Sequence, residues 1–425
     1  MNKKLLCTLI ALICLALVST GCWDRIEVEQ LAIVRSIAID YLPGRKAPYL
    51  VTLAISLPSD IAGGEGGGGG EPTQLFSGVG ATINLALEQA NFNLSRRLFL
   101  SHAELFIVSE ELGRHGLTHV LDFIVRHPQV RLNAFLLVTP GMAQKCLTAP
   151  ERLEAGVTEE IIGMIHQAQT SPESDPQQAF KFLRQMASPG QDPYISILML
   201  SDPLTTVIPE LKDELKPGGQ EESSGGGSGE SGGSGGGGGG EEQEQVLTLV
   251  GQAAFQDDKL VGLMNGVETR GFLWFMGRTE RAVITVSDPE DPDGIVSTHV
   301  ARVETTIKPQ IKNGQVSFTV QVEEEGDIRS VSSQTNLATT EMIPKINSAK
   351  AAVIKHEMEK ALRKMQELKT DLVGFGAILN RKDPDMFRQL QENWSEEFSK
   401  LTVDIVVISE IRRTGQQSGP VQQHR

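Results

Sequence analysis

Two glycine-rich tracts divide this 425-residue chain and limit where its hydrophobic cores can form. Seven of the 43 glycines lie at residues 63–70, and fourteen more lie at residues 218–240. Residues 217–245 contain no side chain that could join a core. Because Gly- and Ser-rich segments behave as flexible coils, the sequence predicts a tether at residues 213–245 and a glycine-rich insertion at residues 63–70.

The charge balance argues against a nucleic-acid partner. The chain has 39 Lys+Arg and 54 Asp+Glu, which gives a formal net charge of −15. Proteins that coat DNA or RNA need clustered basic side chains to displace counterions from the phosphates. Nine acidic residues against two lysines lie between residues 210 and 244, so much of the excess negative charge falls in the predicted tether. There it keeps the chain solvated.

The N-terminus has the pattern of a lipoprotein signal. Two lysines precede an apolar stretch at residues 5–18, and the small residues Ser19, Thr20 and Gly21 then precede Cys22. A stretch of this length is shorter than the roughly 20 residues that a membrane-spanning helix needs. We therefore expect a signal peptide at residues 1–21, cleavage before Cys22, and lipidation of Cys22 with diacylglyceryl and acyl chains such as palmitate. The lipid would anchor the mature chain to a membrane.

The cysteines of the mature chain exclude an intramolecular disulfide if Cys22 is alkylated. Only Cys146 then remains as a free thiol. It has no His or second Cys nearby in the sequence, which favours a buried small residue over a nucleophile. The hydrophobic core alone must therefore stabilise this exported chain, and its length permits this.

Strands and helices alternate before the predicted tether. This pattern predicts a mixed α/β N-terminal domain at residues 22–212. The expected strands lie at residues 31–40, 49–58, 105–108, 131–138 and 195–200, and the expected helices at residues 81–91, 116–125, 158–169 and 176–186.

The region after the tether has a different pattern. Short strand-like runs, residues 272–275 among them, predict a small β-rich middle domain at residues 246–290. A hairpin around Asn313-Gly314, a long helix at residues 343–368, a second helix at 384–398 and a last strand at 401–411 follow. They predict a C-terminal α/β domain at residues 291–415, an antiparallel sheet with one long packed helix, before a disordered tail at 416–425. The fold class is therefore α+β or mixed α/β, with several domains.

The sequence offers no convincing catalytic, cofactor or metal site. Gly78-Val79-Gly80-Ala81 resembles half a dinucleotide fingerprint, but Ile83 occupies the place of the third glycine. His356 lacks the second histidine one turn later that a zinc helix needs. No Gly-x-Ser-x-Gly motif supports a hydrolase. We therefore predict a protein that is not an enzyme.

Two aromatic residues near the C-terminus allow two interpretations. Gly374 and Gly376 flank Phe375 and are predicted to end the long helix. Trp394 lies on the next predicted helix. In a chain with only 5% aromatic residues, both side chains are expected in the core first, and contact with a partner subunit is the alternative.

Several short sequence blocks, each occurring once, follow one another along nearly the whole mature chain. They are Gly21-Cys22-Trp23-Asp24-Arg25, Phe99-Leu100-Ser101-His102-Ala103-Glu104, Asp122-Phe123-Ile124-Val125-Arg126-His127-Pro128, Glu268-Thr269-Arg270-Gly271, Asp371-Leu372-Val373-Gly374-Phe375-Gly376 and Ile411-Arg412-Arg413-Thr414-Gly415. This order resembles the Ger(x)C family, the lipoprotein C-subunits of nutrient germinant receptors in spore-forming bacteria. The two glycine tracts depart from the family pattern.

The resemblance implies a non-enzymatic lipoprotein with three α/β domains on the outer face of the spore inner membrane. It would assemble with integral-membrane germinant receptor subunits and be needed for the germination response. It implies no cofactor and no metal. The alternative is a solute-binding lipoprotein that captures a small nutrient directly, for which two comparable α/β lobes would be expected.

Overall fold

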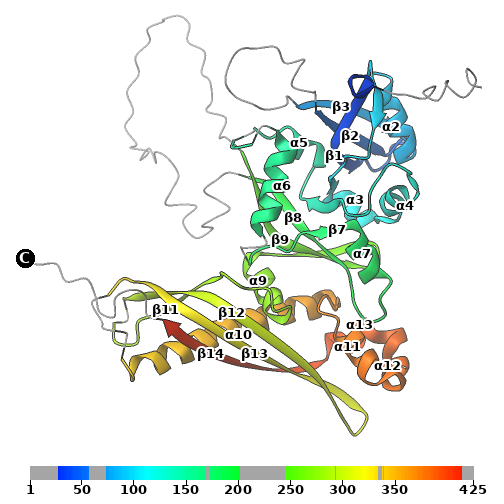
Figure 1. The fold of residues 1–425 in the computed structure, drawn as a ribbon. Helices are drawn as coiled ribbons and strands as arrows, with labels where there is room; N and C mark the ends of the chain where they lie inside the picture. The colour runs from blue at the N-terminus through cyan, green and yellow to red at the C-terminus, as the bar shows by residue number, and fades with distance from the viewer. Residues whose placement is uncertain are drawn as a thin grey trace, which may run out of the picture.

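The structure, a computed structural model, contains two sheets arranged end to end (Figure 1). It describes residues 27–56, 73–150, 152–154, 156–168, 172–201, 245–291, 293–333, 337 and 339–413. The expected signal peptide, Cys22, the glycine insertion, most of the tether and the C-terminal tail therefore lie outside the described residues.

The larger sheet has ten strands and carries the N-terminal half of the chain. Its main order is β10-β9-β8-β6-β5-β1-β2-β3, with β4 beside β1 and β7 beside β6. The strands β1, β5, β6 and β8 run parallel, whereas β2, β3, β9 and β10 pair antiparallel with their neighbours. Their bounds are β1 Leu31–Tyr41, β2 Tyr49–Ser56, β3 Thr73–Gly80, β4 Arg97–Phe99, β5 Leu105–Ser109, β6 Phe135–Thr139, β7 Gln177–Gln178, β8 Tyr194–Ser201, β9 Val246–Gln256 and β10 Lys259–Met264.

Helices cover both faces of this sheet, so its central strands are apolar throughout, as in β5. One face packs against α2 (Ile83–Asn91), α3 (Glu110–His115), α4 (Thr118–Arg126) and α7 (Ala179–Met186). The other packs against α5 (Ala143–Leu147) and α6 (Val157–Ala168). The prediction of a mixed α/β N-terminal region is confirmed.

The strands β9 and β10 correct the prediction of a separate middle domain at residues 246–290. The strand β9 pairs antiparallel with β8, from Tyr194 opposite Ala254 to Ser201 opposite Val246. The strands on the two sides of residues 202–244 are therefore neighbours in one sheet. The tether predicted from glycine content stays a prediction, and composition says nothing about whether the strands on its two sides pair.

Residues 272–275 are also corrected, because they end the helix α9 (Gly266–Phe275) instead of forming a strand. Asn265 and Glu268 form a reciprocal capping box at its start. The run Phe272-Leu273-Trp274-Phe275 is fully buried. Because the last turn of this helix is buried on all sides, these four residues include no polar position, and the run resembles a buried strand.

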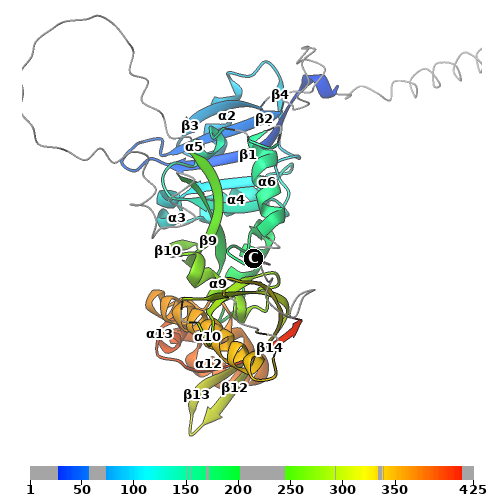
Figure 2. The same ribbon diagram turned by 90° about the vertical axis from the view of Figure 1, so that its left-hand side faces the viewer.

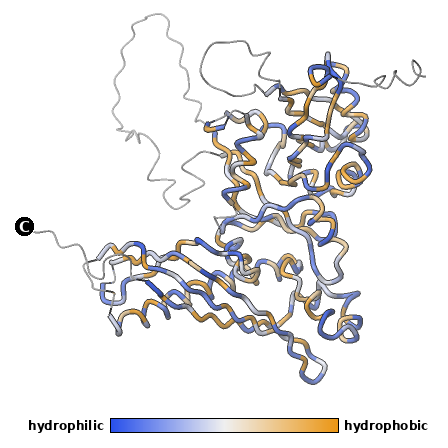
Figure 3. The backbone as a smooth tube through the Cα atoms, in the orientation of Figure 1, coloured by the Kyte–Doolittle hydropathy of each residue, from blue (hydrophilic) through white to orange (hydrophobic). Residues whose placement is uncertain are grey.

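The smaller sheet has the order β11-β12-β13-β14 and is covered on one face by α10 (Met342–Leu368), as Figure 2 shows. The strands are β11 Val283–Ser287, β12 Ile295–Lys312, β13 Gln315–Val331 and β14 Thr402–Arg413. Asn313 and Gly314 both have positive φ, 52° and 78°, which confirms the predicted hairpin turn. Hydrophilic and hydrophobic residues alternate along this hairpin (Figure 3). The last strand runs parallel to β13, so the sheet is not wholly antiparallel.

The last residue of α10 agrees with the predicted range 343–368, but the residue that stops the helix is not the predicted Gly374 or Gly376. The helix ends at Leu368, and Lys369 takes the left-handed conformation at φ 57°. Gly374 instead precedes α11 (Phe375–Lys382). The single helix predicted at residues 384–398 is divided into α12 (Pro384–Leu390), a 3-10 turn (Gln391–Asn393) and α13 (Trp394–Ser399).

Candidate functional site at the junction of the two sheets

Cys22 lies outside the described residues, so its lipidation stays a prediction. Cys146 is 1% exposed, and its thiol lies 3.3 Å from Oγ1 of Thr139. Burial raises the pKa of this thiol to about 11. The thiolate needed for nucleophilic chemistry is therefore scarce at neutral pH, in agreement with a structural role.

The glycines of the half fingerprint lie on β3 under α2. A Cβ atom at Gly78 would overlap the backbone of Ala86 and Ala90, and one at Gly80 would overlap that of Leu85 and Ala86. These glycines let a helix pack directly against the strand, so they do not form a phosphate-binding loop. His356 is exposed on α10, and the described part of the chain has no group of three His, Cys, Asp or Glu side chains placed to hold a metal.

The two sheets meet where the loop before β8 contacts the segment between α10 and α11. Asp192 and Asp371 exchange two hydrogen bonds: the Asp192 amide donates to the Asp371 carbonyl at 2.9 Å, and the Asp371 amide donates to the side-chain Oδ2 of Asp192 at 2.7 Å. The Ala377 amide donates to the Gly190 carbonyl at 2.9 Å. Gly190, at φ 77°, lies against Gly376 so closely that neither position has room for a side chain.

The Asp371 carboxylate organises this segment. It accepts the amide N–H groups of Gly374, Phe375 and Gly376 at 2.8 to 2.9 Å, and Nε1–H of Trp394 at 3.0 Å. Its residue is 1% exposed. One carboxylate therefore holds both the start of α11 and the first residue of α13, which explains why the block Asp371 to Gly376 combines an acid with two glycines.

The carboxyl groups of the buried Asp371 and the half-buried Asp192 lie at one contact, where each disfavours ionisation of the other. Burial raises the pKa of Asp371 to about 6, although the three amides and Trp394 oppose the shift. Burial and then the neighbouring charge of Asp371 raise the pKa of Asp192 to about 7, against the hydrogen bond from the Asp371 amide. The junction therefore contains groups that change charge near neutral pH.

A second contact joins α9 to α10. Glu357 accepts hydrogen bonds from the Arg270 guanidinium and, at 3.0 Å, from Nε1–H of Trp274. Gly271 lies against the Glu357 backbone, where any Cβ atom would overlap its carbonyl oxygen. Because α9 follows β10 of the larger sheet, this close approach connects the larger sheet to the long helix of the smaller one.

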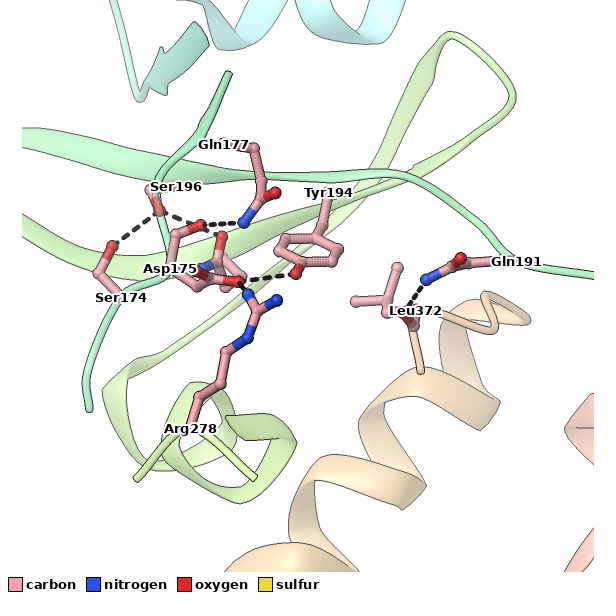
Figure 4. Close-up of polar contacts among 9 residues, drawn as sticks. Ser174, Asp175, Gln177, Gln191, Tyr194, Ser196, Arg278 and Leu372 are labelled. Atoms are coloured by element: carbon pink, nitrogen blue, oxygen red, sulfur yellow. Dashed lines mark hydrogen bonds and ion pairs between the residues drawn. The ribbon is translucent and has the colours of Figure 1, made fainter. Parts of the chain in front are cut away.

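A third contact is a polar cluster around Asp175 (Figure 4). Oδ2 of Asp175 accepts from Nη1 of Arg278 at 2.6 Å and from the Tyr194 hydroxyl at 2.7 Å. Burial and the Asp175 charge raise the pKa of Tyr194 well above its usual value. A cavity of about 470 Å³ opens beside the cluster, and the charged side chains that line it are Asp175, Lys181, Arg278 and Glu280.

Phe375 and Trp394 are both buried, at 0% and 7% exposure. The Phe375 ring lies 4.9 Å from Phe318 and 6.0 Å from Phe398. This supports the core interpretation over a subunit contact. Asp175, Asp192, Arg278 and Glu357 were not singled out from the sequence, because each acts with a partner more than 80 positions away or in another element.

The order of these elements matches known spore germination proteins. The description "Spore germination protein N-terminal domain" matches residues 24–200, and "Spore germination B3/GerAC like, C-terminal" matches residues 250–415. The chain belongs to the GerAC/GerKC family of spore germination proteins. This is the C-subunit family of germinant receptors.

Individual relatives match over nearly their full length. The spore germination protein KC of Bacillus subtilis (strain 168) is 28% identical over 424 residues, covering 98% of this chain and 97% of that protein. The spore germination protein YndF of the same organism is 22% identical, covering 92% and 93%. The crystal structure of the GerBC protein shares the fold, with a TM-score of 0.52 and 17% identity over 91% of this chain and 99% of that one.

The two matched regions of this GerAC/GerKC family member do not coincide with its two sheets. The first region ends at residue 200 in β8, and the second begins at residue 250 in β9. These two strands pair with each other. In the described residues, no helix is long and apolar enough to cross a bilayer.

Proposed function

We propose that this chain is a non-enzymatic lipoprotein subunit of a nutrient germinant receptor. Acylated Cys22 holds it on the outer face of the spore inner membrane, where it assembles with integral-membrane receptor subunits. Its part in germination is to complete that complex, without chemistry of its own.

The observation that carries this proposal is the match of two germination-protein descriptions, in order, at residues 24–200 and 250–415. The pattern of small residues before Cys22 supports the lipid anchor. Two acyl chains hold a protein stably on a bilayer, whereas a single chain binds it only marginally. The burial of Cys146, Glu357 and Asp371 supports a structural role for these three groups.

Direct capture of a small nutrient is the second candidate, and the charged cavity beside Asp175 is the observation in its favour. A solute-binding lipoprotein would be expected to have two comparable lobes. The ten-stranded and four-stranded sheets of this chain differ in size and topology. A nutrient that raises the melting temperature of the mature chain would support this candidate, since ligand at about 100 times its Kd adds about 2.7 kcal/mol.

Replacing the lipidation residue tests the proposal. Spores carrying Cys22→Ala should germinate poorly with the cognate nutrient, because the unacylated chain has no anchor beside its partners. They should germinate normally with a trigger that bypasses the receptors. Loss of refractility and release of dipicolinate, measured with both triggers, give the result.

A Cys146→Ala strain is the matched control, since it removes the other cysteine of the mature chain and should respond like the parent. Equal impairment of the Cys22→Ala spores under both triggers would indicate a general envelope role. The decisive strain lacks the redundant receptors and carries Cys22→Ala. If its spores respond normally to the nutrient and the variant protein is still bound to the membrane, the proposal is refuted.

A further inference from the structure

The loop between α2 and β4 exposes a large apolar side chain to solvent. Phe92, the residue directly after α2, is 78% exposed. Asn91 and Asn93 on either side are polar and exposed. An exposed aromatic ring between polar neighbours is typical of an interfacial membrane anchor. The apolar ring can move from water into the lipid interface while the polar neighbours stay hydrated.

Strand register shows that α2 runs toward the end of the sheet where β1 begins. The helix α2 runs antiparallel to β3, because Gly80 meets the backbone at Leu85 whereas Gly78 meets it at Ala90. The helix therefore runs toward the beginning of β3, and Ala90 near its end lies beside Gly78. Thr73 at that beginning pairs with Ser56, which in turn pairs with Ile33 of β1.

The strand β4 brings the loop beside the start of the described chain. Arg97 pairs with Leu31, the first residue of β1. The 3-10 turn η1 (Val28–Gln30) comes directly before it, and Val28 is 61% exposed. Figure 2 shows η1 and β4 at the same end of the molecule.

The lipid anchor of the proposed function reaches only a short way from this end. Glu27 is the first described residue, five positions after Cys22. At about 3.3 to 3.6 Å per extended residue, the anchor lies within roughly 17 Å of Glu27. A bilayer holding the acyl chains is therefore close to η1 and to the loop after α2.

We propose that this end of the larger sheet rests on the phospholipid surface, with Phe92 inserted into the interfacial layer. The contact surface consists of residues 92–97 and η1. Its charges are balanced, since it has two arginines, Arg96 and Arg97, and two acids, Glu29 in η1 and Glu27 directly before it. We therefore expect adhesion to depend on the apolar ring and only weakly on anionic lipid or salt.

The proposal rests on the proposed anchor at Cys22, so its test supplies a lipid chemically. The mature chain, residues 22–425, is coupled through Cys22 to a single-chain maleimide lipid. Cys146 stays unmodified because it is buried. A single acyl chain gives only marginal binding, with an association constant of about 10⁴ M⁻¹, so any contribution of the loop is measurable by vesicle sedimentation.

The substitution Phe92→Ser should lower partition into phosphatidylcholine vesicles about tenfold, which corresponds to roughly 1.4 kcal/mol. The matched control is Ile408→Ser, which removes a side chain that is 44% exposed on β14 of the smaller sheet. It should partition like the parent chain. Adding phosphatidylglycerol or 0.5 M salt should change the difference in partition between Phe92→Ser and the parent chain only slightly.

Equal partition of Phe92→Ser and the parent chain would overturn the proposal, as would an equal loss in Ile408→Ser. If Phe92→Ser partitions normally but its spores lose the nutrient response, the loop contacts a protein and the membrane contact is wrong. Failure of Cys22 acylation in spores, with the vesicle result intact, would refute the proposed anchor and leave the surface standing.

Discussion

At the scale of single residues, the carboxyl group of Asp192 at the junction makes the stability of the chain depend on pH. The pKa of Asp192 is raised from 3.8 to about 7. A carboxyl group with a raised pKa binds its proton more tightly in the folded chain than in the unfolded one. The free energy of unfolding therefore falls as pH rises from about 4 to about 7, and this loss is complete above that range.

The substitution Asp192→Asn should remove this loss. The amide oxygen of asparagine can still accept the Asp371 N–H, but the side chain has no charge to bury. The melting temperature of the variant minus that of the parent chain should increase steadily from pH 4 to pH 7. Thermal unfolding followed across that range measures the difference.

The control is Asp385→Asn, which neutralises a carboxylate whose side chain is 80% exposed on α12. Its melting temperature should stay at a constant offset from the parent. A constant offset for Asp192→Asn as well would contradict the raised pKa at the junction.

Residues also mark the limit of what the sequence could predict. Cys146 was correctly expected in the core, because a cysteine with no His or second Cys nearby in the sequence is most often a buried small residue. The buried pair of Lys350 and Glu324, 2.8 Å apart and both without side-chain exposure, was not. Its partners come from α10 and β13, and only the tertiary fold brings such charges together.

At the scale of elements, local chemistry predicted most of the hairpin and helices, whereas pairing between distant strands was missed. Asn313-Gly314 defines its turn through positive φ, so the β12–β13 hairpin follows from adjacent sequence. The long amphipathic spacing of α10 likewise predicted residues 343–368 closely. The parallel pairing of β14 with β13 depends on a connection of 70 residues, from 332 to 401, and has no local signal.

The packing of α9 on α10 makes an element-scale prediction about glycine. The substitution Gly271→Ala places a methyl group into the Glu357 carbonyl oxygen. Overpacking of this kind should lower the free energy of unfolding by about 1 to 3 kcal/mol. Urea denaturation of the mature chain measures the change.

A matched control is Gly163→Ala on α6, where a Cβ atom would meet nothing within 4 Å. Alanine is the better helix former, so this variant should gain about 0.5 to 1 kcal/mol. Opposite signs at the two glycines would support the close helix contact. A gain in Gly271→Ala would mean that α9 and α10 lie farther apart than described.

At the scale of the whole molecule, the segment between β8 and β9 joins two parts that are already held together. The strand β9 lies between β8 and β10 in one sheet. Arg278, after the segment between β8 and β9, pairs with Asp175 before it, and Asp371 likewise contacts Asp192. The composition of residues 213–245 predicted a tether between separate domains, but these contacts predict one cooperative body.

Cutting the chain in this segment tests that conclusion. A protease recognition sequence placed within the glycine tract at residues 225–240 allows a single cut in the folded mature chain. The two fragments should elute together in size-exclusion chromatography at micromolar concentration, because the main-chain hydrogen bonds of β8 and β9 and the burial around α9 survive the cut. They should separate only in denaturant, where both sets of contacts are lost. Separation of folded fragments in buffer would instead restore the domain boundary at the tether, and it would mean that β9 can leave the larger sheet without unfolding it.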